Sequence, residues 1–424
     1  MHTEATEKWA HGTMTNYYDE LETQDSNTRQ QAMIQAVAAQ VAHAKSKTTA
    51  YGKILADINP DDLTSVEAIT QLPLTRKSEL IELQESARPF GGLAAVKAPE
   101  LTHIFASPGP IYEPGSKRED FWRFSRSLFA TGFRAGDVVH NCFSYHFVPA
   151  GLMLESGAHA LGCAVIPAGV GQTELQVQTI ADLKPNGYVG TPSFLKIILE
   201  KADEMGADVS SLKKALVSGE ALPPPLREGF KKRGIQVLQC YATADLGVIA
   251  YETEAMEGLI IDEGVYVEIV RPGTGELVPD GEVGEVVVTS LNPDYPLIRF
   301  ATGDLSAIMD GTSPCGRTNR RIKGWMGRAD QTAKVRGMFI HPEQVDKVIK
   351  RHPEISKARL IVDWVNESDS ITLQYESNSH SDDLNSAIAN SIRDICKVRG
   401  DAKLTDIGSL PNDGKVIDDI RKYD

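Results

Sequence analysis

Residues 264–304 read GVYVEIVRPGTGELVPDGEVGEVVVTSLNPDYPLIRFATGD, and the pattern of this stretch indicates the class of fold. Val265, Val267 and Ile269 alternate with Tyr and Glu, and this period of two predicts a β-strand. A loop rich in glycine and proline follows, and Val283 and Val287 belong to a second apolar run. Two such runs around turn-forming residues predict an antiparallel β region.

The chain upstream follows a different pattern. Residues 29–49 repeat apolar side chains at helical spacing, which predicts an amphipathic helix. From about residue 137, short apolar runs alternate with helical segments, at 164–166, 187–189, 215–217 and 237–239. This alternation is typical of βαβ units and predicts a mostly parallel sheet. The expected fold class is α/β.

The C-terminal part predicts a second, smaller domain. Residues 331–424 read as a strand, a helix, strands and a helix, and they end in a loop around residues 411–415. A stretch rich in glycine and arginine, IKGWMGRAD, precedes this pattern. We therefore expect a large N-terminal α/β domain over residues 1–327 and a small α+β domain over residues 328–424.

Composition excludes several functional classes. The 424 residues carry a net charge of −14, which argues against binding to nucleic acid or to an anionic membrane surface. The sequence has no run of about 18 apolar residues, so we expect no membrane span. The 5 cysteines form no CxxC pair, and the N-terminal MHTEATEKWA lacks the apolar core of a signal peptide. We expect a cytoplasmic protein with reduced thiols, and the sequence leaves a homodimer open.

Two motifs place carboxylates in loops. Tyr241, Ala242 and Asp245 lie in YATAD after a predicted parallel strand, where α/β sheets bind ligands. An ordinary loop with a surface aspartate is the competing interpretation. Asp304 ends a TGD turn, where a fixed carboxylate can accept both hydroxyls of a ribose. A plain type I turn is the alternative there.

Two further motifs carry positive charge. GRAD at residues 327–330 precedes KVRG at residues 334–337, and these cations can offset phosphate charge or form a solvated basic loop. Lys415 follows a glycine on the last loop, where its amine can reach a phosphate or a carboxylate. Taken alone, a lysine in a tail is more often simply solvated.

The order of these motifs along the chain, YATAD, TGD, GRAD, RG and the final GK, resembles that of the phenylacetate–CoA ligase branch of the adenylate-forming (ANL) superfamily. The similarity covers nearly the whole chain: residues 17–77 resemble the helical N-terminal region of that branch, and residues 139–151 resemble its substrate-pocket segment. Residues 281–343, which contain ATGD, GRAD and RG, match most specifically. The resemblance implies that ATP, with Mg²⁺, activates a small acid as an acyl-adenylate before its transfer to coenzyme A.

The resemblance also implies a role for each matched residue. Lys415 would be catalytic and would bridge the acyl carboxylate and the α-phosphate, while Asp245 would be catalytic and lie near Mg²⁺. Asp330 would be the hinge, and Arg336 and Gly337 would border the CoA channel. The nucleotide would be bound by Ser107, Gly109, Gly219, Glu220, Tyr241, Ala242, Asp304 and Arg328. The acyl pocket would be lined by Phe143, Tyr145, His146 and Phe147.

The acyl-pocket segment predicts the kind of acid. Its three aromatic side chains favour a small aromatic acid over a long-chain fatty acid, because aromatic rings attract one another beyond their burial. Packing in the core is the alternative for these rings. His146 is equally compatible with a structural, hydrogen-bonded histidine.

The chain departs from the pattern of this branch at three places. The phosphate loop, usually similar to ASSGTTGKP, aligns with ASPGPIYEP at residues 106–114, where Glu113 would repel phosphate. Ala244 stands where a threonine or serine usually lies near the phosphate. Cys315 is the one cysteine where some relatives have CPC, and one cysteine cannot build a four-ligand zinc site, so we expect no structural zinc. Ser107, Gly109, Ser116, Lys117 and Arg118 are the candidates for holding pyrophosphate instead.

Two other functions stay open at this point. The acyl acceptor can be an amine or a carrier-protein thiol in place of CoA, because the acceptor channel is built from backbone and surface shape. A degenerate, non-catalytic nucleotide-binding or acid-binding homologue is the second alternative, motivated by the altered phosphate loop. The retained Asp304, Arg328 and Lys415 argue against it.

Overall fold

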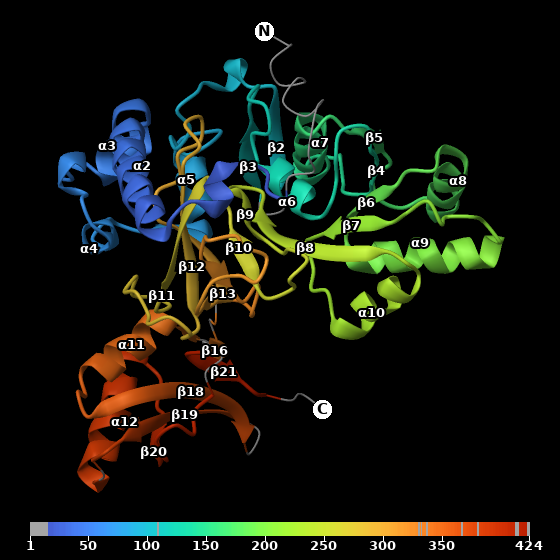
Figure 1. Ribbon diagram of the computed structural model, residues 1–424. Helices are drawn as coiled ribbons and strands as arrows, with labels where there is room; N and C mark the ends of the chain where they lie inside the picture. Colours follow the sequence, from blue (N-terminus) through green and yellow to red (C-terminus); the bar gives the residue numbers. More distant parts are fainter. Residues whose placement is uncertain are drawn as a thin grey trace. The chain divides into compact units, whose positions relative to one another are not determined.

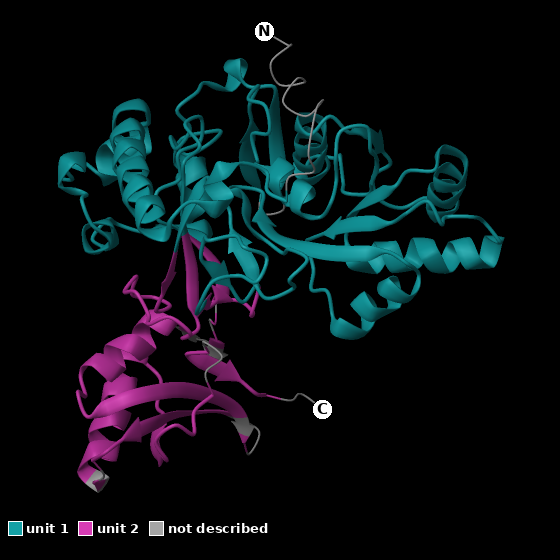
Figure 2. Cartoon of the chain, viewed as in Figure 1, with its two compact units in different colours: residues 1–267, 288–300, 309–324 teal, residues 268–287, 301–308, 325–424 magenta. Residues whose placement is uncertain are grey.

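The computed structural model describes residues 16–107, 110–329, 331, 333–335, 338–365, 368–379, 381–411 and 415–421. The chain forms two compact units, which Figure 2 shows in different colours. Unit 1 comprises Met1–Val267, Val288–Phe300 and Met309–Gly324, and unit 2 comprises Glu268–Val287, Ala301–Ile308 and Trp325–Asp424. The domain boundary after residue 327 stays a prediction.

Unit 1 begins with a group of helices (Figure 1). The longest is α2 (Ser26–Lys47), which confirms the amphipathic helix predicted over residues 29–49. Asp25 caps this helix, because its carboxylate accepts the backbone N–H groups of Asn27 and Thr28. The other elements of the region are η1 (Glu20–Thr23), α3 (Thr49–Ile54), η2 (Pro60–Asp62), α4 (Val66–Thr70), β1 (Thr75–Arg76), η3 (Lys77–Glu79), α5 (Leu80–Ser86) and η4 (Ala98–Glu100).

A sheet of mainly parallel strands forms the centre of unit 1 and confirms the predicted βαβ pattern. Its parallel strands are β4 (Val138–Asn141), β5 (Ala164–Pro167), β6 (Gly187–Gly190), β7 (Lys214–Val217) and β8 (Gln236–Thr243). Three antiparallel strands extend it in the order β15-β10-β9-β8-β7-β6-β4-β5, namely β9 (Gly247–Tyr251), β10 (Leu259–Ile261) and β15 (Arg321–Ile322).

Helices bury their apolar faces against this sheet. Val177, Leu195 and Phe230, from three different helices, share a core with Tyr188 and Val217 of the strands. Burial of this apolar surface is the main force that holds the layers together. The helices of this part of unit 1 are α6 (Phe124–Ala130), α7 (Ala150–Ala160), α8 (Thr173–Leu183), α9 (Pro192–Met205) and α10 (Pro224–Lys232).

Strands β11 (Val265–Val270) and β12 (Gly284–Ser290) are neighbours in one sheet, as the alternating pattern predicts. Strand β13 (Phe300–Ser306) lies next to β12 and contains the whole TGD motif, so the turn predicted for these residues is wrong. All residues of β12 are buried, so this strand is a core element. The two-residue strand β14 (Ile308–Met309) follows β13 along the chain.

The C-terminal part of unit 2 has its own sheet and its own core. The sheet order is β20-β19-β18-β21, with β18 and β19 antiparallel and both outer strands parallel to their neighbours. Val345, Ile388, Leu360 and Leu373 share the core between the helices and this sheet. The elements are β16 (Ala333–Val335), β17 (Met338–Ile340), α11 (Pro342–Lys350), β18 (Ile355–Val365), β19 (Ser368–Ser377), α12 (Asp382–Cys396), β20 (Asp401–Thr405) and β21 (Ile417–Asp419).

This order confirms the predicted strand, helix, strands and helix, and it adds β17, β20 and β21, which the sequence pattern did not predict. Among the described residues, no helix combines the length and the apolar character that crossing a membrane needs.

Candidate active site

The YATAD motif lies at the carboxyl end of β8. Tyr241 is buried and pairs with Ala250 of β9, and the pairing register shifts between Tyr241 and Ala242. Asp245 follows in the turn before β9 and is also buried, with 7% of its surface exposed. A β-bulge re-aims the side chains beside it, and ligands of α/β sheets bind at this end of parallel strands. The structure therefore places these predicted residues at the carboxyl end of the parallel strands.

Asp245 forms an ion pair with Lys77. The Lys77 Nζ and Asp245 Oδ2 atoms lie 2.6 Å apart, and the Asp245 side chain is 0% exposed. Within the described part of the chain, the other oxygen, Oδ1, is buried and has no hydrogen-bond partner. Lys77 was missed as a site residue, because it lies 168 positions away and no local pattern links the two side chains.

The altered phosphate loop forms a hairpin of β2 (His103–Ser107) and β3 (Ile111–Gly115). The Ser107 hydroxyl donates a hydrogen bond of 3.0 Å to Glu113 Oε2, and Glu113 is 1% exposed. Burial raises the pKa of Glu113 to about 7, and the negative charge of Asp245 adds to this effect. A carboxyl with this pKa is partly protonated near neutral pH, which weakens its repulsion of phosphate. Gly109 lies outside the described residues.

Gly219 and Phe143 bring the predicted nucleotide and acyl residues together. A Cβ atom at Gly219 would lie 3.9 Å from Phe143 Cε1 and 3.7 Å from Thr191 Cγ2. The φ angle of Gly219 is +83°, which favours glycine at this position. Glu220, the next residue, accepts a hydrogen bond of 2.6 Å from the Ser193 N–H in the first turn of α9. Its carboxylate is thus fixed at a helix N-terminus.

The rest of the acyl segment divides into a fixed and an exposed part. The Tyr145 hydroxyl donates to Glu155 Oε2 at 2.7 Å and accepts from Asn141 Nδ2 at 2.8 Å. Burial raises the pKa of Tyr145 well above its usual value, and the nearby carboxylate of Glu155 adds to this effect. His146 and Phe147 are exposed, and their rings contact each other edge to face. Because 67% of Phe147 is exposed, the structure does not join these two residues to the buried ring of Phe143.

In unit 2, the structure joins Asp304 and Arg328. Arg328 Nη1 lies 2.9 Å from Asp304 Oδ1, and Trp325 Nε1 donates to the same oxygen at 3.1 Å. The two segments also form a β-bridge at these residues. A Cβ atom at Gly303 would lie 2.8 Å from Arg328 Nη2, so glycine leaves room for the guanidinium. Trp325 was missed, since a single tryptophan beside a loop carries no sequence signal.

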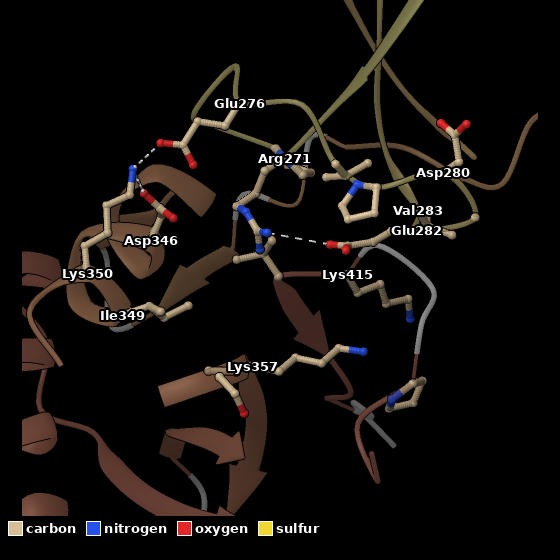
Figure 3. Close-up of a pocket in the computed structure, with 18 residues that line it drawn as sticks. Arg271, Glu276, Asp280, Glu282, Val283, Asp346, Ile349, Lys350, Lys357 and Lys415 are labelled. Atoms are coloured by element: carbon tan, nitrogen blue, oxygen red, sulfur yellow. Dashed lines mark hydrogen bonds and ion pairs between the residues drawn. The ribbon is translucent and has the colours of Figure 1, made fainter. Parts of the chain in front are cut away.

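Lys415 lies at the C-terminal end of the last loop. Its Nζ atom is 2.7 Å from Asp418 Oδ1, and its side chain is 48% exposed. The side chain lines a cavity of about 800 Å³ within unit 2, together with Lys357, Lys350 and Arg271 (Figure 3). Exposure is what a charge that must reach a substrate requires. The predicted hinge Asp330 and the predicted CoA residues Arg336 and Gly337 lie outside the described residues.

The chain is similar in sequence to known proteins. Residues 120–292 match the family model of AMP-binding enzymes. The chain is 34% identical over 356 residues to the phenylacetate–coenzyme A ligase of Aromatoleum evansii, covering 80% of this chain and 79% of that enzyme. It is 29% identical to the phenylacetate–coenzyme A ligase of Escherichia coli K12, covering 94% and 95% of the two chains.

A solved structure with a similar fold is the open conformation of 2-hydroxyisobutyryl-CoA ligase in complex with 2-HIB-AMP and CoA. The TM-score is 0.73 at 23% identity, and the alignment covers 96% of this chain and 94% of that enzyme. At this identity, the similarity establishes the fold alone.

Proposed function

This chain belongs to the phenylacetate–coenzyme A ligase family, and we propose that it joins a small aromatic acid to coenzyme A through an acyl-adenylate. It is an ATP-dependent, AMP-forming carboxylate–CoA ligase. The observation that carries the aromatic assignment is the approach of the Phe143 ring to Gly219. This approach sets an aromatic wall beside residues assigned to the nucleotide.

The family resemblance assigns nucleotide binding to several of the residues described above. Tyr241 would stack on adenine, beside Ala242. Asp304 would accept the two ribose hydroxyls, and Arg328 would assist it. Charge-assisted hydrogen bonds of this kind contribute about 1.5–3 kcal/mol each. Trp325 already orients the Asp304 carboxylate, since it donates to Oδ1.

The first step is attack on ATP. A carboxylate oxygen of the acid forms a bond to the α-phosphorus, and the bond between that phosphorus and the pyrophosphate oxygen breaks. This displacement depends mainly on positioning and on neutralising negative charge. Lys415 would supply a positive charge between the acid and the α-phosphate. Mg²⁺, when bound, supplies further positive charge to the phosphates, and Asp245 is the residue that would hold it, through its buried Oδ1.

The second step is transfer to the thiol. The CoA sulfur attacks the acyl carbonyl, AMP leaves with the bonding electrons, and the thiol proton is released. A mixed anhydride is already a reactive acyl donor, so no covalent enzyme intermediate is needed. The proposal includes a rotation of the C-terminal domain about Asp330 between the two steps. It also places Arg336 and Gly337 along the CoA channel.

The identity of the acid is tested with a panel of acids in the presence of ATP and CoA. Formation of the CoA ester is scored as kcat/KM for arylacetates, benzoates and aliphatic acids. We expect an aryl acid to be the best substrate and Tyr145→Ala to lower its kcat/KM. The aromatic assignment is contradicted if hexanoate or a longer aliphatic acid has a kcat/KM that exceeds that of every aryl acid by roughly tenfold or more. Such a difference is larger than the contribution of aromatic contacts.

A further inference from the structure

Strand β21, which follows Lys415, has a paired strand on one side and a side-chain contact on the other. On one side, β21 pairs with β18, and the Leu360 N–H donates to the Val416 carbonyl at 2.9 Å. On the other side, no described strand pairs with β21, because it is the outermost strand of its sheet. Strand β21 has only three residues, so contacts on its outer side add to the few hydrogen bonds that the β18 pairing supplies.

A single side chain occupies that open edge. Gln331 Oε1 accepts a hydrogen bond of 2.8 Å from the Ile417 N–H and a second hydrogen bond from the Val416 N–H. Both donors are backbone groups directly after Lys415, so this one amide oxygen fixes the backbone that carries the lysine. Gln331 is also the residue next to the predicted hinge, Asp330.

The other end of the same loop is fixed by buried groups of the sheet. Arg359 Nη2 donates to the Pro411 carbonyl at 3.1 Å, and Glu376 Oε1 accepts from the Leu410 N–H at 2.8 Å. Arg359 and Glu376 are 5% and 4% exposed, so this anchor belongs to the core of unit 2. The C-terminal end of the loop is held by the β18 pairing, by the ion pair between Arg359 Nη1 and Asp418 Oδ2 at 3.6 Å, and by Gln331.

We propose that Gln331 is a positioning residue that sets the location of Lys415 for the adenylation step. The inference rests on the proposed function of Lys415 and assigns to Gln331 a role that acts through it. Because Gln331 adjoins the predicted hinge, a change of backbone angles at Asp330 would carry the lysine backbone with it. The second step does not use the Lys415 charge, and it would therefore not depend on Gln331.

The test compares both half-reactions in the full-length enzyme. Gln331→Leu removes the acceptor oxygen, and we expect acid-dependent ATP–pyrophosphate exchange to fall by roughly 10-fold to 30-fold, since misplacing a charged group in a closed site costs this much rate or more. Thioester formation from supplied acyl-adenylate should stay within about twofold, because that step makes no use of the lysine. Gln331→Glu keeps the acceptor and should restore exchange to within about threefold of the wild type.

A matched control is Gln344→Leu. Gln344 also bonds backbone groups within unit 2, since it accepts from the His341 N–H and donates to the Ile395 carbonyl. It lies on α11 rather than beside the lysine, so the ratio of the two half-reaction rates should be unchanged. The inference is overturned if Gln331→Leu lowers the rates of both half-reactions equally. It is also overturned if this variant keeps the wild-type rate of ATP–pyrophosphate exchange.

A double variant separates this inference from the proposed function. If Gln331 acts through Lys415, then Gln331→Leu lowers exchange no further once Lys415→Ala is present. An additional loss of tenfold or more in that background overturns the positioning role. If Lys415→Ala itself leaves exchange at the wild-type rate, the role of Lys415 fails, and the inference fails with it. Hydrogen exchange of the Val416 and Ile417 amides measures the contact independently of activity, and unchanged protection in Gln331→Leu also counts against the inference.

Discussion

Asp245 in unit 1 and Lys415 in unit 2 are the two charged groups assigned to catalysis, and the chain holds them in opposite ways. Asp245 is 0% exposed at its side chain and is paired with Lys77 at 2.6 Å. Lys415 has a side chain that is 48% exposed, and it pairs with Asp418 within its own segment. A buried pair is fixed before any substrate arrives, because separating it leaves a charge without solvent. An exposed lysine on a loop can change partners at low cost.

The difference suggests a division of labour. Under the proposed function, the buried carboxylates and the aromatic ring of unit 1 would be in place before substrate binds. The Lys415 charge would be used in only one of the two steps. Each prediction below tests one side of this comparison.

The largest effect is expected for Lys415→Ala. Loss of one charge at the reacting phosphate should raise the adenylation barrier by about 2–4 kcal/mol, while thioester formation from supplied acyl-adenylate persists. Lys350→Ala is the matched control, because Lys350 lines the same cavity and its side chain is 53% exposed. ATP–pyrophosphate exchange measures the first step. Equal losses in both steps would refute the division of labour.

Asp304→Ala tests the fixed part of unit 2. Losing the hydrogen bonds to ribose should raise the KM for ATP and lower kcat, at a cost of about 1.5–3 kcal/mol in kcat/KM. The wild type should also lose activity with 2′-deoxy-ATP, whereas the variant should barely distinguish it from ATP. A wild type that uses both nucleotides equally well rules out the ribose role.

Lys77→Met tests the buried pair of unit 1. Removing the cation leaves the Asp245 carboxylate buried and alone, and we expect the free energy of unfolding to fall by about 1–3 kcal/mol. Lys201→Met is the control: the Lys201–Glu204 pair has the same 2.6 Å distance and the same 31% exposure of its lysine, but its carboxylate is 65% exposed. That variant should leave the free energy of unfolding nearly unchanged, because the pair is exposed to solvent. Urea unfolding measures both, and equal effects would mean that burial of Asp245 is unimportant.

Glu113→Gln should give the smallest effect, and the size of this effect depends on pH. Burial and the charge of Asp245 raise the pKa of Glu113 to about 7 in the folded state, above its ordinary value of 4.5. The wild type therefore loses stability as pH rises from about 4.5 to about 7, because the folded state binds a proton that the unfolded state has released. Above pH 7 the variant should be more stable by about 1–2 kcal/mol, and near pH 4 the two should match. A difference in Tm that does not change between pH 4 and pH 8 would contradict this.

Local patterns were enough to predict most elements of the fold. The helix at residues 29–49, the strands of the parallel sheet and the order of the C-terminal elements each follow from the spacing of apolar residues along a short segment. Strand β21 was not predicted because its three residues are too few to show the alternation of apolar and polar side chains. Asp304 and Arg328 could be paired in advance because their motifs follow each other in a resembled order, and the structure joins them.

The rest of the site depends on contacts between distant segments. Nothing near Lys77 or Asp245 in the sequence indicates that they pair, and the inward direction of Glu113 follows from packing of the β2–β3 hairpin. Phe147 is exposed where the pattern favoured a pocket wall, because its φ of 63° turns the chain at that point. An aromatic residue in such a segment therefore does not by itself predict a buried ring.

Acid-dependent exchange of labelled pyrophosphate into ATP, in the absence of CoA, tests the central claim most directly. The claim is that this chain adenylates an aromatic acid although its phosphate loop carries Glu113. The account predicts exchange that requires the acid and the enzyme, that needs no CoA, and that is strongest with an arylacetate or a benzoate. The claim would be contradicted if every aromatic acid tested gave a rate of exchange no greater than that of the reaction without acid.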